Sequence, residues 1–296
     1  MDNTSNSNYI LSGYEALSTQ WFIEVFEPLT GAFCIEVRSA VEETISSFES
    51  KYSRFDAQSL LSELNSKQVV PYDYHLAQML TLGKEMTIAS GGIFNLFIKD
   101  ALESKGYGLT TSPPSEEGEM VSDFFITEKE IALTGTKSVD LGGIGKGYLI
   151  DVIAHMMRDT YHVEQFLING GGDMYGTHDN GNAIVVYLQH PKDRDMIIGL
   201  LAIKNQSLCS SSSYVRMWVK DGVTKNHFVT EGGKEVWAAS FVVCSTAVVC
   251  DMLATVLCIS SGDEPTCTSH AAHYGAKFLV LPEKGEAFGD LGVDPV

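Results

Sequence analysis

The chain is short of basic residues, and this shortage argues against one broad class of partner. Its 296 residues include 20 Lys and Arg against 38 Asp and Glu, which gives a net charge of −18. A protein that binds nucleic acid needs cations to displace the counterions of the phosphate backbone, so we expect no nucleic-acid partner. The same charge disfavours any anionic ligand. A phosphate group would need a metal ion or backbone N–H groups to hold it.

Long apolar runs and a targeting signal are missing as well. No apolar run reaches the length of about 18 residues that a membrane span requires, so we expect no membrane span. The segment from Met1 to Asn8 is polar and acidic, without a basic stretch followed by an apolar one. It therefore predicts no secretion signal and a cytoplasmic location. With 44% hydrophobic residues, the chain can bury a large core and should be globular.

The six cysteines lack the spacing of a metal site. The sequence contains no C-x-x-C pair and no His at zinc-finger spacing. Cys250 and Cys258 lie in an apolar run with helical periodicity. We interpret most of the cysteines as small buried hydrophobic residues in a reducing compartment.

The polarity pattern predicts a mixture of strands and helices. Residues 21–26 alternate as a strand does, and Val37, Val41, Ile45 and Phe48 then recur with helical spacing. Further helices are expected after residue 59, over 75–88, from 148 and over 245–259. Strands are expected at 166–168, 184–188, 197–203 and 214–219, and hairpins at 124–133 and around 221–222. Residues 104–121 are expected to form an exposed loop.

The connections between these strands decide the fold class. Because most strands follow one another through short turns, we expect antiparallel pairing with helices packed on the sheets, an α+β fold. The length and the hydrophobic content favour one large domain or two tightly joined lobes. We place a single large domain at residues 21–296, with residues 1–20 as an N-terminal extension and the start of the first strand.

A glycine-rich segment at residues 139–148 could approach a ligand closely. Four glycines follow Asp140, and a helix is expected to begin at their end. Missing Cβ atoms let a ligand reach the backbone, and a helix N-terminus offers free N–H groups to phosphate. Lys146 adds a full positive charge. The segment matches neither a Walker A loop nor G-x-G-x-x-G, and a purely structural turn is the alternative.

Asp251 and Thr255 are spaced four residues apart in the apolar run 245–259. On a helix this spacing places the carboxylate and the hydroxyl on one face. Both groups are hard oxygen ligands suited to Mg²⁺. Alternatively, the Asp serves the helix dipole and the Thr bonds its own backbone.

Three other polar segments have simpler interpretations. We interpret residues 169–173, N-G-G-G-D, as a plain turn. The serine run with the tyrosine that follows it, residues 210–214, could bind phosphate oxygens or be a simple polar loop, and the sequence favours the loop. His227 follows the hairpin expected at 221–222, and a lone His more often packs than catalyses.

Five short motifs occur in the order in which a known family carries them. Residues 140–151, D-L-G-G-I-G-K-G-Y-L-I-D, match the pattern D-x-G-G-I-A-K-G-Y-x-x-D, and residues 250–255 match A-D-A-L-A-T. Residues 171–173 match a G-G-D turn, residues 92–95 match G-x-F-D, and residues 53–65 echo S-x-Y-x-x-x-S-x-x-x-x-x-N. Over nearly its whole length the chain thus resembles the FAD:protein FMN transferase (ApbE-type) family.

The resemblance implies a T-fold-like, ApbE-type domain, with FAD as substrate and Mg²⁺ as metal ion, and it assigns roles to twelve positions. The implied roles are the lining of the flavin or adenine sites for Leu17, Phe55, Ile93, Phe94, Asn95 and Phe228; FAD contacts for Asp140 and Lys146; magnesium ligation for Asp251, Thr255 and the carbonyl oxygen of Gly143; and proton transfer near the phosphate for His227.

The implied reaction moves FMN from FAD to a Ser or Thr hydroxyl of an acceptor flavoprotein and releases AMP. Mg²⁺ would neutralise the pyrophosphate and stabilise charge on the leaving oxygen, with assistance from Lys146. Transfer of FMN to water by the same residues, an FAD pyrophosphatase activity, is the first alternative.

Four positions depart from the family pattern. Leu17 replaces Met, Phe55 replaces Tyr, Asn95 replaces Asp, and Thr230 stands where the Asp of an H-x-x-D-P segment is expected. Magnesium binding can survive the loss of two carboxylates because Asp251 is retained. The departures motivate a second alternative, a non-catalytic FAD-binding protein.

Overall fold

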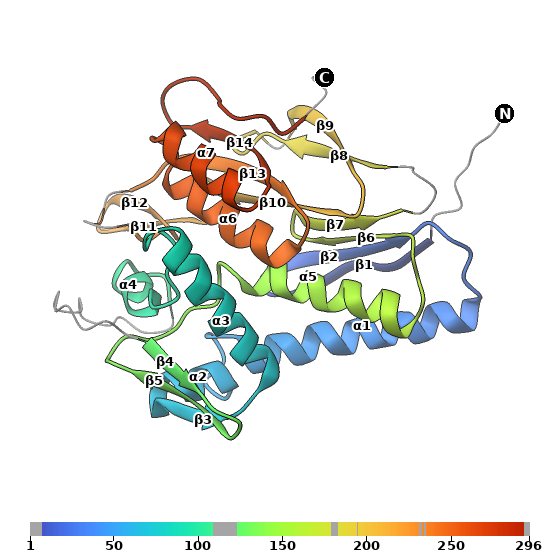
Figure 1. Cartoon of the computed structure of the whole chain (residues 1–296), viewed down its shortest axis with the longest axis horizontal. Helices are drawn as coiled ribbons and strands as arrows, with labels where there is room; N and C mark the ends of the chain where they lie inside the picture. Colours follow the sequence, from blue (N-terminus) through green and yellow to red (C-terminus); the bar gives the residue numbers. More distant parts are fainter. Residues whose placement is uncertain are drawn as a thin grey trace.

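A seven-stranded antiparallel sheet, with the strand order β1-β2-β6-β7-β10-β13-β14, forms the centre of the molecule (Figure 1). The computed structural model describes residues 8–108, 123–178, 183–193, 195–230, 233 and 235–292. Helices α5 and α6 lie across one face of this sheet, and α1 runs beside α5 (Figure 1). The hairpin β8–β9 packs on the opposite face. The predicted α+β fold with antiparallel sheets is confirmed.

The smaller sheets are two hairpins, β8–β9 and β11–β12, and the three-stranded antiparallel sheet β3-β5-β4. The strands are β1 (Asn8–Ala16), β2 (Thr19–Val25), β3 (Val69–Pro71), β4 (Asp123–Ile126), β5 (Glu130–Thr134), β6 (Phe166–Gly170), β7 (Asp173–Thr177), β8 (Ile184–Gln189), β9 (Ile197–Ile203), β10 (Gln206–Ser212), β11 (Met217–Lys220), β12 (Val223–Asn226), β13 (Ala238–Cys244) and β14 (Lys277–Pro282). The helices are α1 (Gly31–Tyr52), α2 (Leu60–Lys67), α3 (Tyr74–Ala89), α4 (Lys99–Ser104), α5 (Gly145–His155), which ends in a π-helical turn (Met156–Thr160), α6 (Ala247–Ile259) and α7 (Glu264–His273).

Strand β13 shows how the layers are joined. All seven of its residues are buried, because both faces of the sheet are covered at this strand. Val242 and Cys244 belong to the core under the helices, whereas Phe241 and Val243 belong to the core under β8–β9. Successive side chains of a strand point to opposite faces, so a strand covered on both sides reads as a continuous apolar run.

The first helix, α1, supplies part of the core on the helical side. Val37, Val41, Ile45 and Phe48, which the sequence places on one helical face, are all buried. Burial of an aliphatic or aromatic side chain of this size stabilises the fold by about 1.5–3 kcal/mol relative to exposure. The Thr30 hydroxyl accepts a hydrogen bond from the N–H of Phe33 and caps the start of the helix.

Helices α5 and α6 approach each other through Gly147. A Cβ added at Gly147 would overlap the carbonyl oxygen of Ala247 and lie 2.7 Å from the Cβ of Asp251. The missing side chain therefore allows the first turn of α5 to contact α6 directly. The N–H of Gly147 donates a hydrogen bond of 3.0 Å to Oδ2 of Asp251 across this contact.

Gly147→Ala is expected to destabilise the protein by about 1–3 kcal/mol or more, because the added methyl group forces two packed helices apart. Gly145→Ala is the matched control on the same helix. Its Cβ would meet only Phe48 at an ordinary contact distance of 3.8 Å, and Ala favours a helix over Gly by roughly 1 kcal/mol. Urea unfolding of both variants provides the measurement. Equal free energies of unfolding for the two variants would contradict this account of the α5–α6 contact.

Several element boundaries differ from the sequence-based predictions. Helix α5 begins at Gly145, three residues before the predicted start at 148. The predicted strand 214–219 begins only at Met217. The interpretation of the serine run 210–213 as a loop is wrong, because residues 210–212 pair with 239–241 of β13. Backbone pairing needs no large side chains, and small polar residues are tolerated where a strand borders a polar cavity.

Strand β1 was not identified from the sequence; it pairs with β2 at the edge of the main sheet. The division into an extension at 1–20 and a domain at 21–296 stays a prediction. Most of the predicted loop 104–121 lies outside the described residues.

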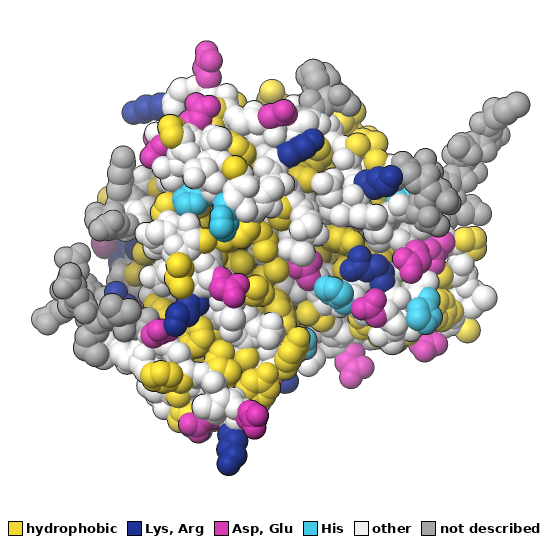
Figure 2. All heavy atoms as spheres, in the orientation of Figure 1, with side chains coloured by type: hydrophobic (Ala, Val, Ile, Leu, Met, Phe, Trp, Pro, Cys, Tyr) yellow, Lys and Arg dark blue, Asp and Glu magenta, His cyan; other side chains and the backbone are white. Residues whose placement is uncertain are grey.

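The described part of the chain contains no helix long and apolar enough to cross a membrane. The six cysteines are unpaired, and all but Cys34 are buried, as the sequence predicts. On the face shown in Figure 2, the basic side chains are scattered and do not form a continuous patch among the coloured residues.

Candidate active site

A cavity of about 800 Å³ is formed by segments that are far apart in the sequence. It extends over the β1–β2 turn, the end of α1, the glycine-rich segment before α5, strand β10, the residues after β12 and one face of α6. All twelve residues to which the sequence assigned a role contribute to its lining: Leu17, Phe55, Ile93, Phe94, Asn95, Asp140, Gly143, Lys146, His227, Phe228, Asp251 and Thr255. The fold thus gathers them around one space.

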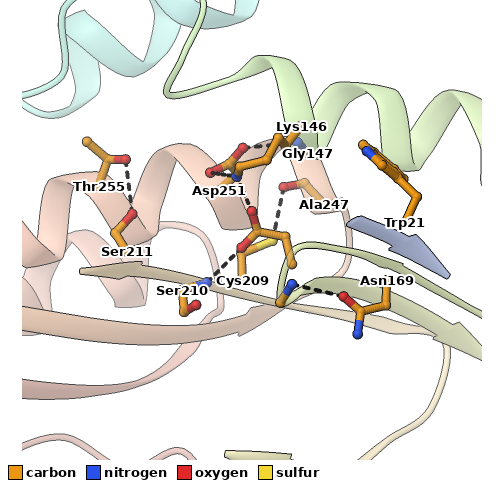
Figure 3. A network of polar contacts seen from close by, with 12 residues as sticks. Trp21, Lys146, Gly147, Asn169, Cys209, Ser210, Ser211, Ala247, Asp251 and Thr255 are labelled. Atoms are coloured by element: carbon orange, nitrogen blue, oxygen red, sulfur yellow. Dashed lines mark hydrogen bonds and ion pairs between the residues drawn. The ribbon is translucent and has the colours of Figure 1, made fainter. Parts of the chain in front are cut away.

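Lys146 lies between two buried carboxylates at the polar side of this cavity. Its ammonium group forms an ion pair with Oδ2 of Asp173 and lies 3.6 Å from Oδ1 of Asp251. The other oxygen of each carboxylate accepts a backbone N–H, from Ser210 in the case of Asp173 and from Gly147 in the case of Asp251. Figure 3 shows Lys146 and Asp251 meeting from the facing helices α5 and α6.

The electrostatics of this cluster leave an excess of negative charge. Burial raises the pKa of Asp251 to about 6; the charge of Asp173 adds to this rise and Lys146 opposes it. Burial acts to lower the pKa of Lys146, but the two carboxylates outweigh it and raise that pKa above its ordinary value. Two carboxylates share one ammonium group here, so a further cation would be stabilised beside Asp251.

Oxygen ligands for such a cation lie close to Asp251. Thr255 follows it by one helical turn, and the hydroxyls of Thr255 and Ser211 are 3.2 Å apart (Figure 3). A Cβ on Gly143 would lie 3.7 Å from Oγ1 of Thr255, which places the backbone of the glycine-rich segment against α6. The described residues contain no cluster of three or more His, Cys, Asp or Glu suited to a metal ion. A cation here would rely on one carboxylate and neutral oxygens.

Asp140 is held by an arginine that the sequence analysis did not single out. Nε of Arg54 lies 2.7 Å from Oδ2 of Asp140, and the two side chains are only 6% and 5% exposed. Oδ1 of Asp140 accepts the N–H of Gly142 at 2.7 Å and so fixes the glycine-rich turn. The guanidinium group of Arg54 also lies over the rings of Phe55 and Tyr107, at 4.4 and 4.9 Å from their centroids. This arrangement forms an aromatic wall of the cavity.

His227 and Phe228 enter the cavity from the open end of the β11–β12 hairpin. Their rings lie 4.4 Å apart, and the backbone carbonyl of Phe228 accepts a hydrogen bond from Lys105 at 2.7 Å. Nδ1 of His227 is buried without a hydrogen-bond partner in the described structure. Burial, and next the charge of Arg216, lower the pKa of His227 to about 3. The ring is therefore neutral, with a nitrogen available to a ligand.

Two tight turns border the cavity side by side. Leu17 and Ser18 join β1 to β2 with φ values of 52° and 60°, a conformation that favours glycine and that stores strain in other residues. The N–H of Leu17 donates a 2.6 Å hydrogen bond to Glu49, which supports this strained turn. The neighbouring β6–β7 turn uses Gly171 and Gly172, with φ values of 73° and 99°. The first turn presents Leu17 to the cavity.

Comparison with known proteins identifies the family of this chain. The sequence profile of the ApbE family matches residues 17–271, which is most of the chain. The chain belongs to the ApbE family.

Two curated relatives are named FAD:protein FMN transferase. The one from Klebsiella pneumoniae (strain 342) is 34% identical over 91 residues, which cover 31% of this chain and 28% of the relative. The one from Rhodobacter capsulatus is 20% identical over 225 residues, 71% of this chain and 43% of the relative. The chain spans less than half the length of these relatives.

Solved structures share the ApbE fold. The ApbE protein of Thermotoga maritima superposes with a TM-score of 0.83 at 20% identity, covering 96% of this chain and 97% of that one. The flavin transferase ApbE of Vibrio cholerae gives 0.78 at 16% identity, with the same coverage. The apo flavinyl transferase ApbE of Pseudomonas stutzeri gives 0.80 at 15% identity, covering 98% and 96%.

Sequence reasoning missed two polar residues of this ApbE-family site, Arg54 and Arg216, and it singled out the segments of Asp173 and Ser211 without giving either residue a definite role. All of them line the cavity. Asp173 was interpreted as part of a plain turn, although it closes the G-G-D motif and pairs with Lys146. That motif was an available signal for Asp173. Arg54 and Arg216 carry no local pattern, because their roles depend on strand pairing and on contacts over long sequence distances.

Proposed function

We propose that the protein is a magnesium-dependent FAD:protein FMN transferase, which moves FMN from FAD to a Ser or Thr hydroxyl of an acceptor flavoprotein and releases AMP. The observation that supports this most directly is the convergence on one cavity of all twelve residues implied by the family motifs. Its volume of about 800 Å³ lies within the range of roughly 300–1,000 Å³ typical of ligand sites. Membership of the ApbE family and the names of the relatives support it as well.

The residues beside Asp251 fit a magnesium ion. Asp251, the Thr255 hydroxyl and the carbonyl oxygen of Gly143 would hold it. Mg²⁺ prefers oxygen ligands and usually binds through one or two carboxylates together with substrate phosphates. The excess negative charge of the Asp173–Lys146–Asp251 cluster favours a cation at this point. When bound, Mg²⁺ would neutralise the diphosphate and stabilise charge on the leaving oxygen.

The protein's own groups would position the reactants. In the reaction, the acceptor hydroxyl loses its proton to solvent as its oxygen forms a bond to the phosphorus of the FMN moiety. The bond from that phosphorus to the bridging oxygen breaks, and AMP leaves with the bridging oxygen. Lys146, fixed by Asp173, keeps a positive charge beside this centre. The aromatic wall at Phe55 and the side chains of Phe94 and Ile93 offer apolar surfaces to the ring systems and exclude water.

His227 would orient the attacking hydroxyl. With a pKa of about 3, its ring accepts a hydrogen bond at neutral pH but is a weak base. Phosphoryl transfer depends mainly on positioning and electrostatics, so a strong base is not required before bond formation. The unpartnered Nδ1 is the atom suited to this contact.

The test is incubation with FAD, Mg²⁺ and a candidate acceptor flavoprotein. We expect a fluorescent flavin band on the acceptor after denaturing electrophoresis, together with release of AMP, and loss of both when EDTA removes the metal. AMP and free FMN without any acceptor would instead indicate an FAD pyrophosphatase. Tight FAD binding without AMP over hours would indicate a non-catalytic FAD-binding protein.

The lowered pKa of His227 predicts an acid-sensitive fold. Below pH 6.5 the unfolded chain takes up a proton at this residue, whereas the folded protein does so only near pH 3. Stability that is present above pH 6.5 is therefore lost as the pH falls, by about 3 kcal/mol between pH 7 and pH 4. His227→Gln should lose correspondingly less over this range in urea unfolding. Parallel pH profiles for the two proteins would contradict the prediction.

A further inference from the structure

Among the described residues, four Lys and Arg side chains line the cavity, and most of them already interact with other protein groups. Arg54 forms a buried ion pair with Asp140, and Lys146 is bound to Asp173 and lies near Asp251. Lys137 takes part in an interaction as well. Arg216 differs from these three, because no carboxylate of the described residues forms an ion pair with it.

The strand register places Arg216 at the cavity end of the β11–β12 hairpin. Met217 pairs with Asn226 in this hairpin, so the residues that flank this pair, Arg216 and His227, lie beside each other. Both line the cavity. The charge of Arg216 also acts on the pKa values of Lys146, Asp251 and His227. Its half-buried guanidinium group therefore belongs to the same polar region as the proposed metal position.

A ligand with phosphate groups needs, in this region, a cation that forms no ion pair with a carboxylate of the protein. The carboxylates of Asp173 and Asp251 outnumber the ammonium group of Lys146, and the whole chain carries a charge of −18. A dinucleotide diphosphate would add further negative charge. One metal ion at Asp251 would be shared between that carboxylate and the phosphates. A guanidinium group without a carboxylate partner can offer a fork of N–H donors to phosphate oxygens.

We propose that Arg216 binds the diphosphate of the dinucleotide substrate. This inference rests on the proposed function, because it assumes that a flavin dinucleotide occupies the cavity. It separates two roles at the site: Lys146 balances the buried carboxylates, and Arg216 recognises the phosphates. The hairpin β11–β12 then contributes directly to substrate affinity.

The first test compares ligand affinities of the full-length protein and its variants in the presence of Mg²⁺. Arg216→Gln is expected to weaken FAD binding about 10- to 100-fold, the range for loss of a charged hydrogen-bonding group. Riboflavin, which has the ring system and no phosphate, should bind the unaltered protein and Arg216→Gln equally. Arg216→Lys should restore part of the FAD affinity, since it keeps the charge and loses the planar fork.

Arg38→Gln is the matched control. It removes the same charge from an exposed side chain that forms an ion pair with Glu42 on α1 and does not line the cavity. We expect this variant to bind FAD as the unaltered protein does. Unchanged FAD affinity in Arg216→Gln overturns the inference, and so does an equal loss of FAD and riboflavin affinity, which would assign Arg216 to the ring pocket.

A second measurement needs no variant. Phenylglyoxal modifies accessible arginines, and mass spectrometry identifies the modified positions. FAD with Mg²⁺ should protect Arg216 from modification in the unaltered protein, riboflavin should not, and Arg38 should react in every case. Modification of Arg216 at the same rate with and without bound FAD overturns the inference while the proposed function stands. Failure of the unaltered protein to bind FAD at all overturns both.

Discussion

Replacing Asp251 by alanine is expected to reduce kcat/KM for FAD by about 100- to 1,000-fold, the range for removal of one preorganised electrostatic group. The reason is that Asp251 would be the only carboxylate ligand among the three proposed for the metal ion. The fold should survive, because Asp251 is a buried carboxylate that is costly to ionise and Lys146 keeps its ion pair with Asp173. Steady-state kinetics over a range of Mg²⁺ concentrations, with a thermal unfolding curve, provide the measurement.

A variant that removes an exposed carboxylate separates this effect from a change in net charge. Asp159→Ala, in the π-helical turn after α5, changes the net charge by the same amount at an exposed position outside the cavity. It should leave kcat/KM unchanged. If Asp251→Ala is as active as the unaltered protein, the assignment of Asp251 as a metal ligand is refuted, whether or not the protein binds FAD.

Replacing Arg54 by alanine is expected to destabilise the protein by about 3–5 kcal/mol, the range for removal of one partner from a buried ion pair. The remaining Asp140 carboxylate would be left buried with a single backbone hydrogen bond from Gly142. The variant also loses the guanidinium plane that lies over Phe55 and Tyr107. Urea unfolding at neutral pH gives the free-energy difference.

Two further variants make the Arg54 prediction specific. Arg38→Ala removes an arginine from an exposed pair on α1 and should cost less than about 1 kcal/mol. Adding Asp140→Asn to Arg54→Ala should recover part of the lost stability, because it removes the unpaired charge. A double variant that is less stable than Arg54→Ala alone would show that charge burial is not the cause.

Much of the fold could be predicted from local sequence patterns. The alternation at β2, the helical spacing of α1 and the antiparallel α+β class are all confirmed, because each depends on which residues face one core. The predictions failed where one local sequence pattern is compatible with two kinds of structure. The serine run 210–213 reads as a loop, yet most of it forms a strand whose partners lie some 30 residues further along the chain.

The sequence predicted the motif residues of the candidate site but not the partners that hold them in place. The motif resemblance pointed to twelve residues, and the structure brings all of them to one cavity. Their roles stay predictions. The partners that hold some of them, such as Arg54 for Asp140 and Asp173 for Lys146, could not be derived from spacing, since 86 and 27 residues separate the members of these pairs. Such pairs are set by the packing of the whole domain.

The order of strands in the main sheet affects how the protein folds. Strand β2 pairs with β6, some 140 residues later, and the polar side of the cavity needs β10 and α6 from the last third of the chain. Contacts over such sequence distances form slowly, because a long loop must close before they stabilise anything. Residues of β10 and α6 line this cavity, so a nascent chain on the ribosome cannot complete the cavity until its C-terminal third has been synthesised.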